Sequence, residues 1–165
     1  MKMITISETV EDEAQILCDI QKAAFLPLYE IYHDSSNPCL RGVEDILNRL
    51  NSPCFRYFTI RFDKMIVGGV LYKCAGRGIF FDKLDAGEYY LQRIYIRPDM
   101  QNRKIAQNAI LLCEKEFHDA IRFTVDFPVD LERNRNCYTS AGFQDTGKRT
   151  EAEPGLILAC FEKML

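Results

Sequence analysis

The chain has 165 residues, of which 47% are hydrophobic and 27% charged, and its formal net charge is −3. This length predicts a single domain over residues 1–165 with enough apolar side chains for a sizeable core, and the ordinary charged fraction excludes wholesale disorder. The negative charge argues against a dedicated nucleic-acid binder, because such domains usually carry a basic patch and a high pI. It is compatible with a cationic amine as substrate.

Cysteine usage points to a reducing compartment. The seven cysteines are odd in number, widely spaced and without a C-x-x-C pair, so neither a disulfide framework nor a zinc site is indicated, and we expect no metal. The start of the chain has no long apolar run, and no stretch has the apolar length that spans a bilayer. The sequence therefore predicts a cytoplasmic protein without a membrane partner.

The first half of the chain contains alternating and helical apolar patterns. Ser7 is suited to cap a helix, and Pro27 interrupts the apolar stripe of that helix. Gly68-Gly69 would weaken a strand, which suggests a bulge or a close neighbouring backbone. We predict a strand over 3–7, a helix to about Phe25, a helix over 43–50, and two antiparallel strands over 54–62 and 65–73 joined by a turn at 63–64.

The second half centres on a strand that ends at Pro98, followed by a turn and a helix. A loop over 75–87 leads into this strand. We predict strands over 88–96, 121–127, 143–149 and 156–163, and helices over 105–117 and 131–141. The element order is therefore β-α-α-β-β-β-α-β-α-β-β, an α/β (α+β) mixed sheet with helices on its faces and one parallel βαβ step.

Residues 101–106 connect the central strand to its helix, and the unpaired N–H groups of the first helical turn lie there. A helix N-terminus fed by a strand is a ready site for phosphate, and Arg103 and Lys104 add two cations. A plain turn with two solvated basic residues explains the same segment equally simply. The residues downstream favour the phosphate site.

The run I-Y-I-R-P-D-M-Q-N-R-K-I-A, residues 94–106, resembles the acetyl-CoA-binding segment of the GCN5-related N-acetyltransferases (GNAT family). Gln101 and Ala106 match the ends of the family motif, whereas Lys104 stands where its first glycine is usual. The resemblance implies that backbone N–H groups of this loop hold the pyrophosphate of coenzyme A. The implied binding residues are Gln101, Asn102, Arg103, Lys104, Ile105 and Ala106.

Residues 134–143, N-R-N-C-Y-T-S-A-G-F, resemble the second family hallmark, a helical Tyr followed by x-x-x-Gly-Phe. The resemblance implies that the phenol of Tyr138 donates a proton as the thiolate of coenzyme A departs, which is general acid catalysis. Packing is the alternative role for a helical tyrosine. Many relatives have an asparagine at the position of Leu131, and Asn134 is the residue here that can replace it in holding coenzyme A.

Leu91 and Ile94 are three residues apart in the central strand, so they share a face only if a bulge lies between them. A strand buried on both faces is the alternative. The resemblance implies a bulge, with the backbone of Ile94, Tyr95 and Ile96 orienting the acetyl carbonyl.

An alkylammonium must lose a proton before it attacks a thioester, so a base or a water relay is expected. Glu88 on the central strand is the first candidate, and Asp126 is the second. His33 and His118 are alternatives. Residues 30–34 belong to the region that borders the acceptor site in this family, although a solvated loop explains them equally well.

The sequence is thus similar to acetyl-CoA-dependent N-acetyltransferases, which implies acetyl transfer to a primary amine of a small molecule or protein by direct attack in a ternary complex. Cys137 has no evident histidine partner, so a covalent route is not favoured. The alternative is a catalytically silent acyl-CoA-binding or regulatory module, which Lys104 and Leu131 favour and Tyr138 disfavours. A plain interaction domain would bind no coenzyme A. A monomer and a homodimer are both compatible with the sequence.

Overall fold

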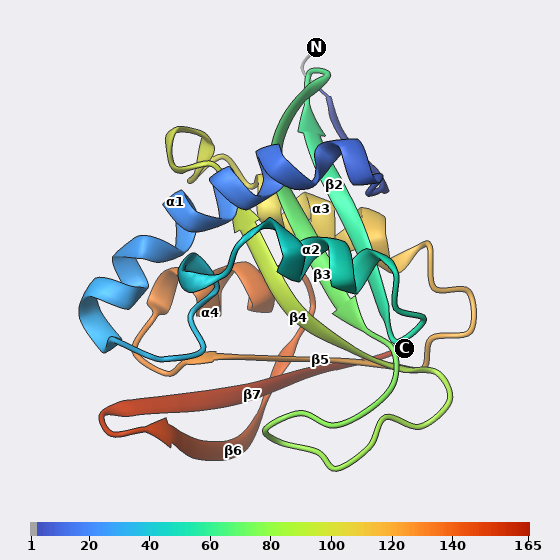
Figure 1. Ribbon diagram of the computed structural model, residues 1–165. Helices are drawn as coiled ribbons and strands as arrows, with labels where there is room; N and C mark the ends of the chain where they lie inside the picture. The colour runs from blue at the N-terminus through green and yellow to red at the C-terminus, as the bar shows by residue number, and fades with distance from the viewer. Residues whose placement is uncertain (1–2) are drawn as a thin grey trace.

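The structure is a computed structural model in which residues 3–165 are described. Its strands form one mixed sheet in the order β1-β2-β3-β4-β5-β7-β6, and helices pack on both faces (Figure 1). The predicted fold class is confirmed. The elements are β1 Ile4–Glu8, η1 Glu11–Glu13, α1 Ala14–Tyr32, η2 Pro38–Leu40, α2 Val43–Leu50, β2 Phe55–Phe62, β3 Met65–Lys73, β4 Glu88–Ile96, η3 Pro98–Met100, α3 Ile105–Glu114, β5 Arg122–Pro128, α4 Glu132–Ser140, β6 Gln144–Glu153 and β7 Leu156–Met164.

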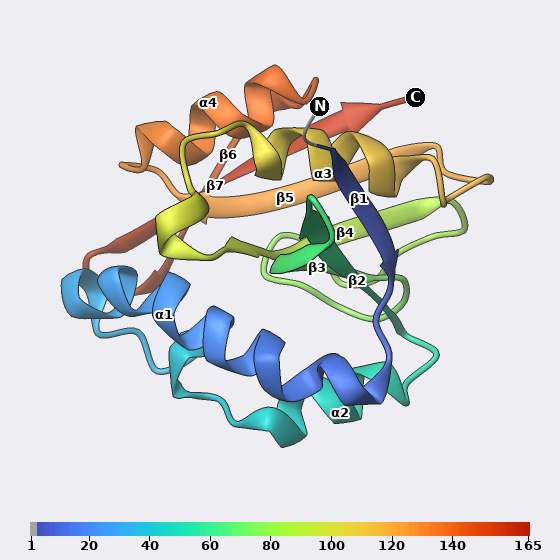
Figure 2. The same ribbon diagram turned by 90° about the horizontal axis from the view of Figure 1, so that it is seen from above.

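The sheet separates two layers of helices, as the view from above shows (Figure 2). Helices α1 and α2 pack on one face, against β2, β3 and β4, and α3 and α4 lie on the other. Each face has its own apolar cluster, centred on Leu17 and Leu71 on the α1/α2 side and on Leu91 and Phe123 on the α3/α4 side. Strand β4 contributes Tyr95 to the first cluster and Leu91 and Ile96 to the second, whereas β5 contributes to the second cluster alone.

The start and end of α1 differ from the sequence prediction. Ser7 does not cap the helix, because it lies in β1 and its hydroxyl accepts a hydrogen bond from Arg61 at 2.8 Å. The chain passes through η1 first, where Glu13 accepts the backbone N–H of Val10. The helix also continues through Pro27 and ends at Tyr32, and the backbone N–H of the following His33 donates to the carbonyl of Tyr29.

The predicted bulge in β4 is confirmed, and Gln92 is the extra residue. In the pairing with β3, Leu91 lies opposite Tyr72 and Arg93 lies opposite Leu71, so Gln92 has no partner. The bulge lets Leu91 and Ile94 both pack on the α3/α4 side. Beyond the bulge, β4 is paired with β3 alone, because its parallel pairing with β5 ends at Leu91 and Val125.

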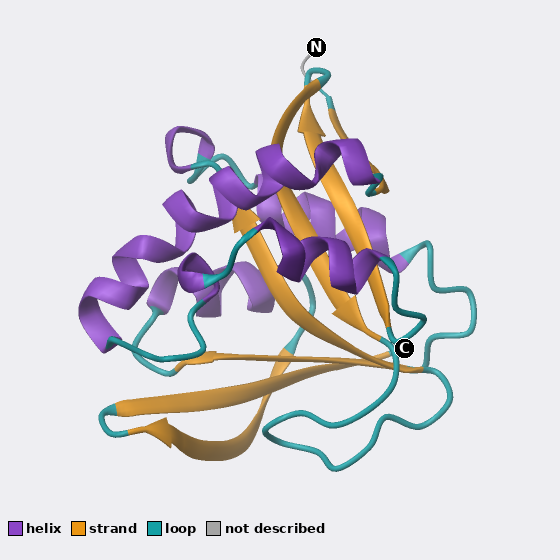
Figure 3. Cartoon of the chain, in the orientation of Figure 1, coloured by secondary structure: helices purple, strands orange, loops and turns teal. Residues whose placement is uncertain are grey.

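Two connections position the functional region. The close neighbouring backbone predicted from Gly68-Gly69 is present, since a Cβ on Gly68 would overlap the carbonyl oxygen of Tyr95 in β4. The long loop between β3 and β4, drawn in teal in Figure 3, returns the chain to the start of β4 as predicted. In this loop Phe81 packs the edge of its ring against Tyr90, with the centroids 5.3 Å apart.

Candidate active site

A cavity of about 440 Å³ lies beside the part of β4 that has separated from β5. Its walls come from the end of β4, the loop before α3, the start of α3, one side of α4 and the second half of α1. The lining residues are Ala24, Phe25, Leu28, Ile94, Tyr95, Ile96, Met100, Gln101, Asn102, Lys104, Ile105, Ala106, Gln107, Arg133, Asn134, Asn136, Cys137, Tyr138 and Ser140.

The loop before α3 is shaped to present backbone N–H groups. Asn102 and Lys104 both adopt left-handed conformations, with φ of 63° and 62°. Gln101 anchors the loop, because its side-chain amide donates to the carbonyl of Ile96 at 2.9 Å. Within the described chain, the N–H groups of residues 105–107 donate to no backbone carbonyl, so the first turn of α3 offers unpaired donors to an anion. Left-handed residues next to such donors form an anion-binding nest.

Helix α4 brings Tyr138 to the opposite wall. Its ring packs between Phe127 and Phe143, at centroid distances of 5.1 and 6.0 Å, and only 6% of the residue is exposed. Burial raises the pKa of the Tyr138 phenol, and the neighbouring Cys137 and Asp126 raise it further. The phenol therefore keeps its proton at neutral pH. A protonated hydroxyl on the wall of the cavity can donate to an anion that develops there.

On the far side of the sheet, Asp126 lies where β4 and β5 part. The hydroxyl of Tyr90 donates to its carboxylate at 2.7 Å. The residue keeps some exposure, but its carboxyl group is surrounded by protein atoms, and this burial raises the pKa of Asp126 to about 6 while the hydrogen bond from Tyr90 lowers it. Asp126 is therefore mostly ionised at neutral pH, and its pKa lies close to neutral pH.

The sequence profile of the acetyltransferase (GNAT) family matches residues 16–143, which span more than half of the chain. This chain belongs to the GNAT acetyltransferase family. Acetyl-CoA is the cosubstrate of this family. No curated protein matches the sequence significantly.

Solved GNAT structures share the fold at low sequence identity. The PaiA N-acetyltransferase from Thermoplasma acidophilum, in complex with coenzyme A, has a TM-score of 0.72 and 15% identity, with 99% of each chain covered. The ribosomal-protein-alanine N-acetyltransferase from Brucella melitensis has a TM-score of 0.74 and 16% identity, covering 98% of this chain and 99% of its own. AAC(6')-Ib, in complex with ribostamycin and coenzyme A, has a TM-score of 0.75 and 12% identity, covering 98% of this chain and 93% of its own.

Most residues that the sequence predicts to hold coenzyme A line the cavity described above. Ile94, Tyr95, Ile96, Gln101, Asn102, Lys104, Ile105, Ala106 and Asn134 line it together with Tyr138. Arg103 lies outside this lining. The predicted loop and the predicted helix, about 30 residues apart in sequence, therefore face each other across one cavity.

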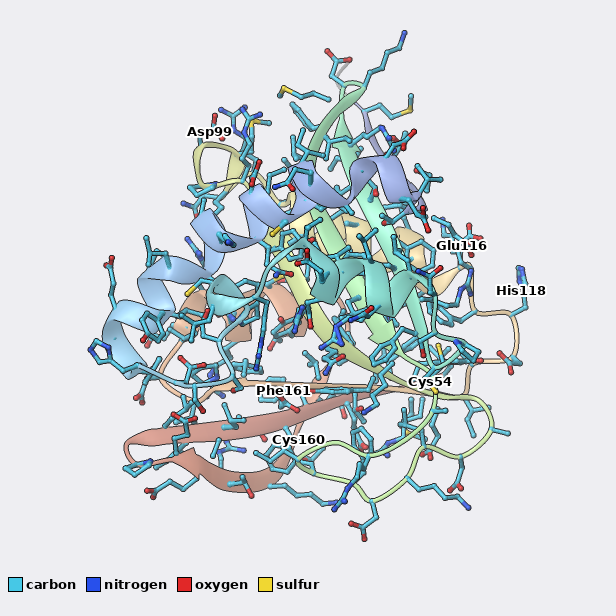
Figure 4. All side chains as sticks on the ribbon, in the orientation of Figure 1. Cys54, Asp99, Glu116, His118, Cys160 and Phe161 are labelled. Carbon is cyan, nitrogen blue, oxygen red and sulfur yellow. The ribbon has the colours of Figure 1, made fainter. Side chains whose placement is uncertain are left out.

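The structure does not bring Glu88 to this place. Glu88 begins β4, six residues before Ile94, and its carboxylate pairs with Arg122 at 3.3 Å and accepts the backbone N–H of Asp85 at 2.9 Å. Figure 4 shows His118 projecting outward from the connection between α3 and β5. His33 is an exposed residue at the end of α1. Of the base candidates, Asp126 alone lies at the divergence of the strands.

Sequence reasoning missed the contribution of α1 and most of α4. Ala24, Phe25 and Leu28 come to the cavity because α1 continues through Pro27, and no local pattern signals this contact across the sheet. Arg133 and Cys137 lie one helical turn apart on α4 and also line the cavity. Asn134 and Tyr138 have the same four-residue spacing one position further along, so the helical period of the predicted helix was the signal that could have found this face.

Proposed function

We propose that the chain is a single N-acetyltransferase domain that transfers an acetyl group from acetyl-CoA to a primary amine of a small molecule or protein. Direct attack in a ternary complex is the proposed route, in the cytoplasm, by a monomer or homodimer. The observation that carries the proposal is the convergence on one cavity of the unpaired N–H groups at the start of α3, the unpaired edge of β4 and the phenol of Tyr138. The seven free thiols support a reducing compartment.

Different groups of residues along the cavity have different roles in the proposed reaction. The turn formed by Gln101 and the first residues of α3 binds the pyrophosphate through backbone N–H groups. Backbone groups of Ile94 to Ile96 on the unpaired edge of β4 orient the pantetheine and the acetyl carbonyl. Acetyl-CoA supplies an activated acyl group, whose carbon forms a bond to the amine nitrogen while its bond to sulfur breaks. Tyr138 gives its proton to the departing thiolate, and the proton that the attacking nitrogen releases passes through a water relay to restore the phenol.

The alternative of a catalytically silent module has less support. Its main argument was Lys104 in place of glycine, but Lys104 already adopts the left-handed conformation that glycine would provide. Tyr138 also retains a place on the wall of the cavity. The named acceptors of the neighbours differ in class: AAC(6')-Ib is bound to ribostamycin, and the Brucella protein is a ribosomal-protein-alanine acetyltransferase. The acceptor class must therefore be sought in the residues of this chain.

Substitution of Tyr138 tests the proposal. We expect Tyr138→Phe to lower turnover about a hundredfold, as typical for loss of a general acid, and to leave acetyl-CoA affinity within about twofold. The matched control is Tyr89→Phe. Tyr89 does not line the cavity, and its hydroxyl donates to the carboxylate of Asp119. Release of free thiol measures turnover, and thermal unfolding with acetyl-CoA measures binding. A protein that acetyl-CoA does not stabilise would refute the proposed function.

A further inference from the structure

Two cysteines lie opposite each other at the open end of the β2–β3 hairpin. Cys54 immediately precedes β2, and Cys74 immediately follows β3 (Figure 4 labels Cys54). The outermost strand pair is Phe55 with Lys73, so the next position on each side of the hairpin is a cysteine. The backbone N–H of Cys74 donates to the carbonyl of Cys54 at 2.7 Å, which extends the pairing to these two residues.

This pairing places the two thiols within reach of a disulfide bond. Directly opposite residues of an antiparallel pair have Cα atoms about 4.5–5.5 Å apart, and their side chains leave the same face of the sheet. A disulfide bridges Cα atoms that are about 4.4–6.8 Å apart. The shared face is that of α3 and α4, because Cys74 packs against the cluster that contains Phe58 and Tyr72. A bond between Cys54 and Cys74 therefore needs no rearrangement of the backbone.

The surroundings of the pair leave the thiols open to reaction. Both cysteines are free and half-buried, so a small disulfide in solution can reach them. Burial raises the pKa of the Cys74 thiol, the guanidinium of Arg56 lowers it, and the neighbouring Cys54 and Asp119 raise it. A cation beside a partly exposed thiol favours the thiolate, which is the form that exchanges disulfides.

The other cysteines of the chain, all within residues 3–165, have no comparable pairing. They lie one to an element, on α1, η2, α3, α4 and β7. The one in a strand is Cys160, whose partner on β5 is Asp126. The register of the sheet therefore distinguishes Cys54 and Cys74 from the rest.

We propose that Cys54 and Cys74 form a reversible disulfide by exchange with a low-molecular-weight disulfide such as glutathione disulfide. The thiolate of one cysteine attacks the S–S bond, which gives a mixed disulfide and releases one glutathione. The other cysteine attacks the mixed disulfide, which closes the bond between Cys54 and Cys74 and releases the second glutathione. Two electrons pass from the protein to glutathione disulfide, and the two thiol protons end on the released glutathione molecules.

The pair is open in a reducing compartment and closes when the thiol pool becomes oxidised. The bond ties the connection between α2 and β2 to the start of the β3–β4 loop. Neither cysteine lines the cavity of the candidate active site, so this inference does not depend on the proposed function.

The experiment treats the whole folded protein with glutathione disulfide, blocks the remaining thiols by alkylation, and digests it with trypsin. Trypsin cuts between the two cysteines, so we expect a pair of joined peptides over 50–56 and 74–77 in the mass spectrum. The bond closes a loop of the chain, and the oxidised protein should therefore unfold at a midpoint about 5 °C or more above that of the reduced protein. Dithiothreitol should reverse both changes.

Single substitutions separate the pair from the other cysteines. Cys54→Ser and Cys74→Ser should each keep glutathione bound to the remaining cysteine, because no second thiol displaces it, and should lose the shift in midpoint. Cys39→Ser is the matched control, since Cys39 is also half-buried but lies on η2, and it should behave as the parent protein. Joining of either cysteine to a different one, stable glutathione on both cysteines of the parent, or a midpoint that oxidation does not raise would each overturn the inference.

Discussion

The strongest stability prediction concerns Asp126, because its surroundings disfavour the ionised carboxylate. Burial raises its pKa from 3.8 to about 6, so the folded protein holds this proton more tightly than the unfolded chain does. The stability that Asp126 contributes is therefore fully present below about pH 4 and is lost as the pH rises through about 6. Replacing it by asparagine removes the ionisation and keeps an oxygen that accepts the hydrogen bond from Tyr90.

The expected magnitude follows from the shift. The change from 3.8 to about 6 is about two pKa units, and each unit corresponds to about 1.4 kcal/mol, so ionisation of Asp126 lowers the stability by about 3 kcal/mol at pH 8. We therefore expect Asp126→Asn to raise the free energy of unfolding by up to about 3 kcal/mol at pH 8 and to change it little at pH 4. For a domain of this size that gain is about 6 °C or more in Tm.

Urea unfolding of the parent protein and of Asp126→Asn, measured at each pH unit from 4 to 8, tests this expectation. The difference in unfolding free energy between the two proteins should grow with pH and level off above about pH 7. Asp130→Asn serves as the control because Asp130 is exposed. A difference that is independent of pH, or a variant that is less stable at pH 8 than at pH 4 relative to the parent, would refute the reasoning from burial.

Three other substitutions give distinct expectations. Lys104→Gly should raise the unfolding free energy by about 0.5–1 kcal/mol in urea titrations, because relieving a left-handed lysine gains more than the added chain entropy costs. A loss of acetyl-CoA affinity in this variant would show instead that the ammonium of Lys104 contacts phosphate. Gly68→Ala should lower it by about 2 kcal/mol, because the new Cβ meets the carbonyl of Tyr95, and unchanged stability would contradict the close approach of β3 and β4. Tyr90→Phe should move the titration of Asp126 to higher pH, observable by carboxyl NMR, because a hydrogen bond that lowers this pKa is removed.

Local patterns predicted most elements. The boundaries of α2 and the turn at 63–64 between β2 and β3 follow from apolar spacing and turn-forming residues, and the structure confirms them. The end of α1 was predicted wrongly, because Pro27 normally interrupts a helix. Here Asn37, from beyond the helix, donates its side-chain amide to the carbonyl of Phe25 at 3.4 Å and helps to hold that region. A contact of this kind has no signature within the helix.

The residues that line the cavity could be predicted from the sequence, but the surroundings of the base candidates could not. Gln101 and Tyr138 are marked by motifs whose spacing is local, and both line the cavity. The position of Glu88 relative to the site depended on where β4 and β5 separate, which the sequence does not state. The environment of Asp126 depends on Tyr90, a residue 36 positions earlier that meets it only in the folded sheet.

The bulge at Gln92 makes β4 two strands joined out of phase. Before Gln92 the residues of β4 pair in register with β5. After Gln92 the residues of β4 line the cavity and face α1. The single extra residue is what keeps both alternations correct at once. Inserting or deleting one residue at this point would consequently exchange the buried and cavity-facing positions of every residue that follows in β4.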